Sequence, residues 1–460
     1  MKTASKVSGA IILIFLALIS SAVFIWPVQA AGIVVNTAAD EDTNNTDCSL
    51  REAIIAANTN SAYNGCNPGA SADFISFAAD FAITLGSPLP AVADYLTIDG
   101  AGHSVTVSGA DQYQVMFVNS GETLYLARIT IANGKAGAGG GVYNNGSLNV
   151  IEVEFSNNRA AGGGYGGGIY NAGTLNVTDS VFSGNWMETT AGDTYGGGIY
   201  NGPTATATVT GSVFNGNWAA SGFGGGIYND GTLTLANDTF YNNGAGDNGG
   251  NLYQNDGSLS VINTTFSHGH AVIGASLYVN GGTVVIQNAI LANRQSGAED
   301  CYKAGGTVSG DHNLIETDGA GVNACGTTSP INNLDPNLGP LADNGGPTQT
   351  MALLYPSPAI DAGNDSVCAA FPVNNLDQRG VARPKRAHCD IGAYELEEGT
   401  QSGPDFVVNT DADGDDGFCD LPGQGVGNQD CSLREAIHAA NAHGGADTIT
   451  FAADYIITLG

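Results

Sequence analysis

Hydrophobic and polar positions alternate along the middle of the chain, and the alternation returns at a nearly constant interval. An aliphatic residue followed by tyrosine recurs every 25 to 30 residues. These pairs are Val142-Tyr143, Ile169-Tyr170, Ile199-Tyr200, Ile227-Tyr228, Leu252-Tyr253 and Leu277-Tyr278. Soon after most tyrosines come alternating aliphatic residues, namely Leu148/Val150, Leu175/Val177, Leu233/Leu235, Leu259/Val261 and Val284/Ile286. An aromatic row closes each period, with Phe155, Phe182, Phe214, Phe240, Phe266 and then Ile290.

This period predicts an all-β fold, a right-handed parallel β-helix with three strands in each turn. Three short strands in about 25 residues, with glycine and asparagine at the corners, do not fit a leucine-rich or helical repeat. Alternation with period two points one face of each strand inward, where like side chains of successive turns stack. Glycine and asparagine adopt the positive φ that sharp corners require. Weaker turns upstream, such as Leu96/Ile98 and Val105/Val107, extend the rod to about eight or nine turns and roughly 40 Å.

A solenoid exposes strand edges at its ends, so we expect caps. Residues 49–58 carry the strong helix signal, since Ser49 and Glu52 have the spacing of a capping box. We expect this helix to cover the first turn. Residues 316–398 are expected to form a loop-rich cap at the C-terminal end.

The N-terminal cap sequence occurs twice. Residues 431–437 repeat residues 48–54, and residues 446–454 repeat residues 72–80. The second copy stops where the first would enter its solenoid, so we expect it to be the truncated start of a second module. The predicted organisation is a signal peptide at 1–30, an N-terminal cap at 31–93, a β-helix at 94–315, a C-terminal cap at 316–398, a linker at 399–404 and the second module at 405–460.

The N-terminal residues predict secretion. Lys2 and Lys6 precede a long apolar run at residues 11–26, and small residues follow at Val28 and Ala30. This arrangement is typical of a cleaved signal peptide. The alternative is a membrane anchor, because the run approaches the roughly 20 residues that span a bilayer. No other segment has the apolar length to span a membrane, so we expect no transmembrane segment after cleavage.

Charge and cysteine content restrict the function classes and the cellular compartment that the sequence allows. The chain has 13 basic and 44 acidic residues and a net charge of −31, which excludes unassisted nucleic-acid binding and electrostatic docking on anionic lipid. A hydrophobic share of 42% excludes intrinsic disorder. Eight cysteines, an even number, suit an oxidising compartment and disulfides, while zinc is disfavoured because no CxxC pair is present. The expected local disulfides join Cys48 with Cys66, Cys301 with Cys325, Cys368 with Cys389, and Cys419 with Cys431.

Three stretches resemble known families. Cys-Ser-Leu-Arg-Glu-Ala at residues 48–53 resembles the bacterial CSLREA domain, which usually lies on the N-terminal side of secreted β-helix proteins. The Gly-Gly-x-aliphatic corners and Phe-Ser-Asn-Asn at 155–158 are similar to the repeats of polymorphic outer-membrane proteins, and Phe-Ser-His-Gly at 266–269 departs from them. Residues 338–346, 357–363, 377–380 and 389–394 are similar to the choice-of-anchor Q domain. The resemblance implies a secreted or surface β-helix protein and implies no reaction.

No catalytic residue is predicted, although parallel β-helices include polysaccharide-degrading enzymes. Arg159 is the only Lys or Arg between Lys135 and Arg294, whereas a polyuronate lyase needs cations. A glycoside hydrolase needs two converging carboxylates. The acidic residues of the turns are Asp179, Glu188, Asp193, Asp230, Asp238, Asp247 and Asp256, mostly beside Gly or Asn. We expect them to lie in corners and loops.

Three clusters of histidine or charged residues are candidates for metal binding or ion pairing. His268 and His270 would share one face of an extended strand, which is a candidate metal pair, but a loop position is the preferred interpretation. Asp411, Asp413 and Asp415 have the alternate spacing of a calcium loop and make calcium the one cofactor that the sequence suggests, with a solvated acidic turn as the alternative. Four basic residues near Asp377 and Asp390 predict ion pairing within the C-terminal cap. They are Arg379, Arg383, Lys385 and Arg386.

Together these patterns predict a secreted or cell-surface β-helix that is a non-catalytic, adhesin-like scaffold. We expect a monomer that binds glycans or surfaces through its repeated tyrosines and corners. The alternative function is a polysaccharide lyase or glycoside hydrolase of the pectin-lyase-like fold.

Overall fold

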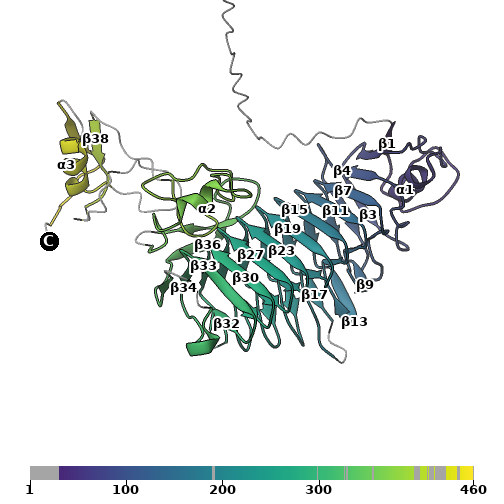
Figure 1. Ribbon diagram of the computed structural model, residues 1–460. Helices are drawn as coiled ribbons and strands as arrows, with labels where there is room; N and C mark the ends of the chain where they lie inside the picture. The colour runs from purple at the N-terminus through teal and green to yellow at the C-terminus, as the bar shows by residue number, and fades with distance from the viewer. Residues whose placement is uncertain are drawn as a thin grey trace, which may run out of the picture.

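The computed structural model describes residues 31–188, 192–297, 299–325, 327, 330–354, 357–397, 405–411, 413, 419, 431–442 and 446–458. The predicted signal peptide and linker lie outside the described residues. The described chain is nearly all-β and winds as a parallel β-helix (Figure 1), which confirms the predicted fold. Among its helices, none combines the length and apolar character needed to cross a bilayer.

In the described chain two long sheets, sheet 1 and sheet 3, run the length of the rod, and sheet 2, which has eight strands, joins them. Sheet 1 consists of β1 (Ala31–Val35), β2 (Asp73–Phe77), β4 (Leu96–Asp99), β7 (Thr123–Ala127), β11 (Ser147–Ile151), β15 (Thr174–Thr178), β19 (Thr206–Thr210), β23 (Thr232–Ala236), β27 (Ser258–Ile262), β30 (Thr283–Gln287) and β33 (Thr307–Asp311). Sheet 2 consists of β6 (Met116–Val118), β10 (Val142–Asn144), β14 (Ile169–Asn171), β18 (Ile199–Asn201), β22 (Ile227–Asn229), β26 (Leu252–Gln254), β29 (Leu277–Val279) and β32 (Cys301–Lys303). Sheet 3 consists of β3 (Phe81–Thr84), β5 (Val105–Ser108), β8 (Thr130–Ala132), β12 (Glu154–Ser156), β16 (Val181–Ser183), β20 (Val213–Asn215), β24 (Thr239–Tyr241), β28 (Thr265–Ser267), β31 (Ile290–Ala292), β34 (Leu314–Ile315) and β35 (Ile331–Asn332).

The central turns contain a fourth strand, so the prediction of three strands per turn is wrong there. Sheet 4 consists of β9 (Lys135–Ala138), β13 (Arg159–Tyr165), β17 (Trp186–Met187), β21 (Trp218–Ala219) and β25 (Gly244–Ala245). Three of these strands have only two residues, and in β17 and β21 an outward tryptophan is followed by a buried methionine or alanine. Such short segments lack a hydrophobic period long enough to be recognised in the sequence.

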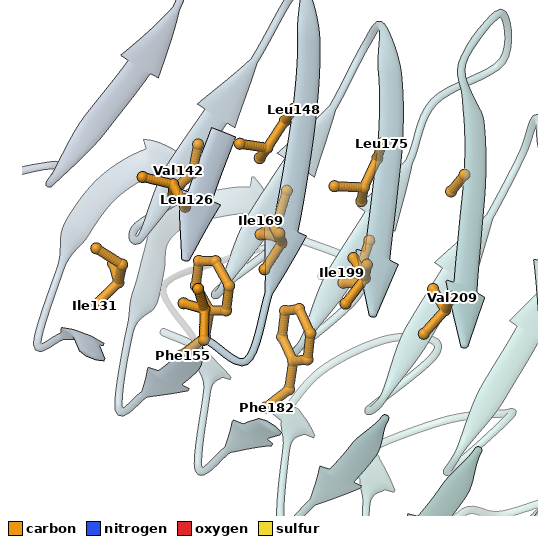
Figure 2. Packing of buried hydrophobic residues seen from close by; sticks show 14 of the residues in the cluster. Leu126, Ile131, Val142, Leu148, Phe155, Ile169, Leu175, Phe182, Ile199 and Val209 are labelled. Atoms are coloured by element: carbon orange, nitrogen blue, oxygen red, sulfur yellow. The ribbon is translucent and has the colours of Figure 1, made fainter. Parts of the chain in front are cut away.

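The core is a set of ladders in which one turn repeats the inward side chains of the last. Phe155, Phe182 and Phe214 are fully buried, with ring centroids 4.8 Å and 4.6 Å apart. Figure 2 shows Phe155 and Phe182 repeating across adjacent turns, as Leu148 and Leu175 do. The predicted end of the phenylalanine ladder is wrong by one residue, because Leu291 pairs with Phe266. Ile290 faces outward instead and packs against the C-terminal segment.

Two rows of buried amides run beside the apolar ladders. One row follows sheet 3, where Asn158, Asn185 and Asn217 bond to one another at 2.9–3.0 Å. The other row ends the strands of sheet 2, where Asn144 donates to Asn171 at 2.7 Å. The amides beside sheet 3 also donate to strand carbonyls of the preceding turn, at Ile131 and Phe155, so successive turns stay hydrogen-bonded beyond the ends of the strands.

The N-terminal cap forms as predicted. Helix α1 (Leu50–Thr59) begins at Ser49, whose side chain accepts from the Glu52 N–H while the Glu52 carboxylate accepts from the Ser49 N–H. Leu50 and Ile54 are buried in the same core cluster as the first strands, so the helix closes that end. Arg51 holds Asp40 through two bonds of 2.8–2.9 Å.

The C-terminal segment does more than close the far end. After η1 (Gly321–Asn323) come β36 (Leu338–Ala342), β37 (Thr350–Leu353) and α2 (Asp365–Ala369), and the chain then turns back along the corner between sheets 1 and 3. Thr348 donates to the Gly211 carbonyl at 2.6 Å, and Asn364 N–H donates to Asn288 at 2.8 Å. The segment therefore spans several turns of the rod.

Ion pairs inside this segment confirm the prediction for three of its basic residues. Arg379 pairs with Asp377 at 2.7 Å and lies 3.7 Å from the centre of the Tyr394 ring. Arg383 pairs with Glu395 at 3.4 Å, with both side chains buried. Lys385 lies 3.8 Å from a Glu397 oxygen. These contacts hold together a region with little regular structure.

The second module repeats the start of the first. Strand β38 (Asp405–Val408) pairs in parallel with β39 (Thr448–Phe451), as β1 pairs with β2. Helix α3 (Leu433–Ala442) occupies the place of α1 in the sequence. All four predicted disulfides are formed.

Candidate functional site

The predicted tyrosine ladder is confirmed, but its ring faces are occupied. Along the outside of sheet 2, seven tyrosines stack with centroids 4.5–5.5 Å apart. They are Tyr143, Tyr170, Tyr200, Tyr228, Tyr253, Tyr278 and Tyr302. A second row of Tyr165, Tyr195 and Phe223 packs across the middle of the ladder.

Burial of this ladder has an electrostatic and a functional consequence. Loss of hydration raises the pKa of Tyr200, Tyr228 and Tyr253 above the ordinary value. Each central ring lies between two neighbouring rings, and these three tyrosines are at most 8% exposed. A sugar ring stacks on an exposed aromatic face. The central tyrosines therefore stabilise the rod and offer no such face.

The seven acidic residues that were expected in corners and loops all lie outside strands. Desolvation is the main cause that raises the pKa of Asp179 to about 6 and that of Asp238 well above its usual range. The negative charge of Asp179 adds to the upward shift at Asp238, and that of Glu152 adds to the shift at Asp179. Asp238 accepts from the Ser212 and Ala236 N–H groups at 2.8 and 3.0 Å. The C-terminal segment covers this corner through Gln378, which accepts from Thr239 at 2.6 Å. Asp238 is thus buried at a corner beneath the C-terminal segment, whereas Asp179 is half-buried.

A polar cleft of about 530 Å³ lies near the C-terminal end of the rod. Its lining residues are His268, Asn293, Arg294, Gln295, Ser296, Gly297 and Glu316. Arg294 donates to Thr317 at 2.5 Å and to the buried Asp300 at 3.3 Å. Desolvation raises the pKa of Asp300 to about 7 despite this arginine. The cleft thus presents hydrogen-bond donors and acceptors, while Asp300 has no exposed surface.

The two histidines occupy a corner, in agreement with the preferred interpretation. His268 has a φ of 54°, which ends the strand before His270, so the two rings do not share a strand face. Nδ1 of His268 lies 2.8 Å from the Ser267 hydroxyl, and Nε2 of His270 lies 3.0 Å from the Asn242 side-chain oxygen. Burial and the neighbouring His270 lower the pKa of His268. Each ring has its own partner.

The calcium prediction rests on three aspartates that the structure describes only in part. Asp411 is exposed, and Asp415 lies outside the described residues. Both oxygens of Asp413 accept from Arg434, at 3.0 and 2.6 Å. Asp40 and Arg51 make the same fork in the first module, which indicates a structural ion pair at Asp413. Calcium binding stays a prediction.

The outer face of sheet 1 carries a repeated surface that the sequence analysis did not single out. The first residue of eight successive paired strands is a hydroxyl side chain: Thr123, Ser147, Thr174, Thr206, Thr232, Ser258, Thr283 and Thr307. None of the eight is buried. The outward positions of β7 through β30 in this sheet contain no charged residue. We call these eight side chains the hydroxyl row.

Sheet 4 carries a second outward surface that the sequence did not reveal. Lys135, Arg159, Trp186, Trp218 and Gly244 follow one another in register, and His270 forms the next bridge. Trp218 is 39% exposed. The signal in the sequence is that each tryptophan follows a ladder phenylalanine, Phe182 or Phe214, by the same number of residues. We call this surface the tryptophan strip.

Searches against protein-family models, curated proteins and solved structures return no match to this chain.

Proposed function

We propose that this chain is an extracellular β-helix scaffold that binds glycan-bearing surfaces in an adhesin-like way and converts no substrate. Four disulfides suit an oxidising compartment. The predicted signal peptide and the resemblance to families of bacterial surface proteins support the same location.

The hydroxyl row is the observation that carries the proposal. Strands in a sheet are about 4.8 Å apart, so eight hydroxyl groups extend over roughly 34 Å. Hydroxyl groups donate and accept hydrogen bonds, as sugar hydroxyls do. An uncharged and repeated face suits many weak contacts with an extended polysaccharide. Several such contacts made at once raise the overall affinity far above that of a single contact.

The alternative enzyme has less support from the described geometry. A glycoside hydrolase needs two carboxyl groups that reach the substrate. Asp179 and Asp238 lie at a corner bonded to the C-terminal segment, and Asp300 is fully enclosed beside the polar cleft. Arg159 and Arg294 each have an acidic partner, so the charge of each is already paired and is not free to bind a polyuronate carboxylate.

The binding test uses the chain from Ala31 to Gly460 and insoluble cellulose, chitin and α-glucan in sedimentation assays. Thr174→Lys, Thr206→Lys and Thr232→Lys are combined in one variant. These charges would have to lose hydration on contact with a neutral surface. We expect apparent affinity for at least one polysaccharide to fall by about tenfold or more.

A matched control places three lysines at exposed positions away from the hydroxyl row, at Ser61, Gln112 and Gln349. The control should bind like the unmodified chain, which separates the surface from the change in net charge. Equal binding by both variants would remove the hydroxyl row from the proposal. New reducing ends or unsaturated products from pectin, alginate or neutral glycans, lost when one turn aspartate becomes asparagine, would make the protein an enzyme.

A further inference from the structure

In the tryptophan strip, the indole of Trp218 packs directly against the backbone of Gly244. At Gly244, the position that follows Trp218 in register, an added Cβ would lie 1.9 Å from Cζ3 of the indole and 2.2 Å from its Cε3. Gly244 does not have a positive φ, so backbone conformation does not require glycine there. The absent side chain instead makes room for the indole, which covers the glycine.

This seat leaves part of the indole open. One side of the ring packs over Gly244, and Trp218 remains 39% exposed. The His270 ring is 6.0 Å away between centroids and tilted by 55°, so it does not stack on the indole. Trp218 therefore differs from the central tyrosines of sheet 2, whose faces are covered on both sides. An exposed indole held by backbone is a suitable platform for an apolar sugar face.

The rest of the strip argues for an uncharged ligand. The Arg159 guanidinium lies 5.6 Å from the centre of the Trp186 ring and 3.5 Å from Asp111. Lys135 lies 3.3 Å from Glu188. Each cation of the strip thus has an acidic partner, and the chain as a whole has a net charge of −31. A polyanionic glycan would be repelled on approach, whereas a neutral glycan would not.

The polar cleft continues from the strip. The Gln295 N–H donates to the Gly269 carbonyl at 3.0 Å, which joins the cleft wall to the residue beside His270. His268, Arg294 and Glu316 supply donors and acceptors within the cleft. Sugar hydroxyls both donate and accept, so a lining of both kinds suits a neutral sugar.

We infer that Trp218 and the adjoining polar cleft form a binding site for a neutral pyranose glycan. One sugar ring stacks on the Trp218 indole, and hydroxyl groups further along the glycan bond within the cleft. The inference rests on the proposed glycan-binding function and adds to it a local site with a ligand class. That site is separate from the hydroxyl row on sheet 1.

Intrinsic fluorescence gives a direct test, because Trp186 and Trp218 are the only tryptophans after the predicted signal peptide. The probes are neutral oligosaccharides of glucose, mannose, xylose and N-acetylglucosamine, with oligogalacturonate as the acidic comparison. We expect a saturable change in tryptophan emission with at least one neutral probe and a weaker response to oligogalacturonate. Absence of a saturable response to every neutral probe, or a preference for oligogalacturonate, would overturn the inference.

Three variants locate the site. Trp218→Ala should weaken binding by roughly tenfold or more, as expected for removal of a central aromatic contact. Gly244→Ala should also weaken it although Trp218 is still present, because the new methyl group displaces the indole. Trp186→Ala is the matched control and should change affinity by less than about threefold. Calorimetry serves as the binding assay where a tryptophan is removed, and circular dichroism checks the fold of each variant.

The outcomes separate this site from the hydroxyl row. If Trp218→Ala retains full affinity for the soluble probe, the inference fails even when sedimentation with insoluble polysaccharide still depends on sheet 1. If soluble probes bind through Trp218 while the sheet 1 lysine variant sediments normally, the inference stands and the role of the hydroxyl row fails. Failure of every glycan in both assays contradicts both proposals.

Discussion

Asn185 offers a sharp test of what holds the turns together, because a single amide there joins three turns of the rod. Its side-chain oxygen accepts from the N–H and the side-chain amide of Asn158, each at 3.0 Å. Its own amide donates to Asn217 and to the Phe155 carbonyl, each at 2.9 Å. The residue is fully buried. The change Asn185→Ala removes all four bonds at once.

The expected loss of unfolding free energy depends on which polar groups keep a hydrogen-bond partner in the variant. The Asn158 side chain retains the Ile131 carbonyl at 2.8 Å, and the Asn217 oxygen retains the Asn185 backbone N–H at 3.0 Å. The Asn158 N–H loses the oxygen to which it donates, and an unsatisfied buried group costs about 1–3 kcal/mol. The lost bonds and the small cavity bring the expected loss of unfolding free energy to about 3–5 kcal/mol.

Urea unfolding followed by circular dichroism measures this loss, and amide hydrogen exchange shows whether it is concentrated in the turns around Asn185. Asn176→Ala is the control, since Asn176 lies on the outer face and makes a single exposed side-chain bond to Asn149 at 3.0 Å. The control should cost less than about 0.5 kcal/mol. Equal stability of the two variants would refute the argument that the amide row binds the turns together.

A charged substitution extends the test to pH. Asn185→Asp would place a carboxyl group against the Asn217 oxygen and the Phe155 carbonyl, in a buried position. Desolvation and these oxygens raise its pKa in the folded state above the unfolded value. The variant should therefore be most stable below the unfolded pKa and lose stability as pH rises through the folded pKa. Asn185→Ala should lack this dependence.

Three further predictions concern the core, the C-terminal segment and the cleft. Phe182→Ala should cost about 3–5 kcal/mol in urea unfolding, whereas Val181→Ala, an outward neighbour on the same strand, should cost far less; unchanged unfolding of Phe182→Ala would place Phe182 outside the core. Joint replacement of Cys368 and Cys389 by serine should remove about 3 kcal/mol of stabilisation from that segment, and limited proteolysis should then cleave residues 343–397 before the rod; uniform cleavage would contradict this. Burial raises the pKa of Asp300 to about 7, so the stability that the protonated Asp300 contributes is full below the unfolded pKa and is lost as pH rises through the folded pKa. Asp300→Asn should therefore reduce the fall in unfolding free energy between about pH 5.5 and 8 by roughly 2 kcal/mol. An unchanged pH profile would show that Asp300 ionises normally.

The apolar ladders of sheets 1, 2 and 3 could be predicted from the sequence, whereas the short strands of sheet 4 could not. Every turn meets nearly the same environment as the one before it, so the inward positions repeat in the sequence and can be recognised there. The same holds for the N-terminal cap, because the capping box at Ser49 and Glu52 is local in the chain. Cysteines close in sequence, such as Cys48 and Cys66, were also paired correctly.

Features that depend on a one-residue register or on contacts between distant segments are visible only in the folded chain. Ile290 and Leu291 are both apolar, and only the strand pairing shows which one faces the core and which one meets the C-terminal segment. The return of that segment along the rod depends on contacts such as Thr348 with Gly211, 137 residues apart, which leave no periodic signal. The seat of Trp218 over Gly244 is of the same kind. Stacking between turns places these two residues together, and the absence of a side chain at Gly244 then lets the indole lie against the backbone while part of it stays exposed.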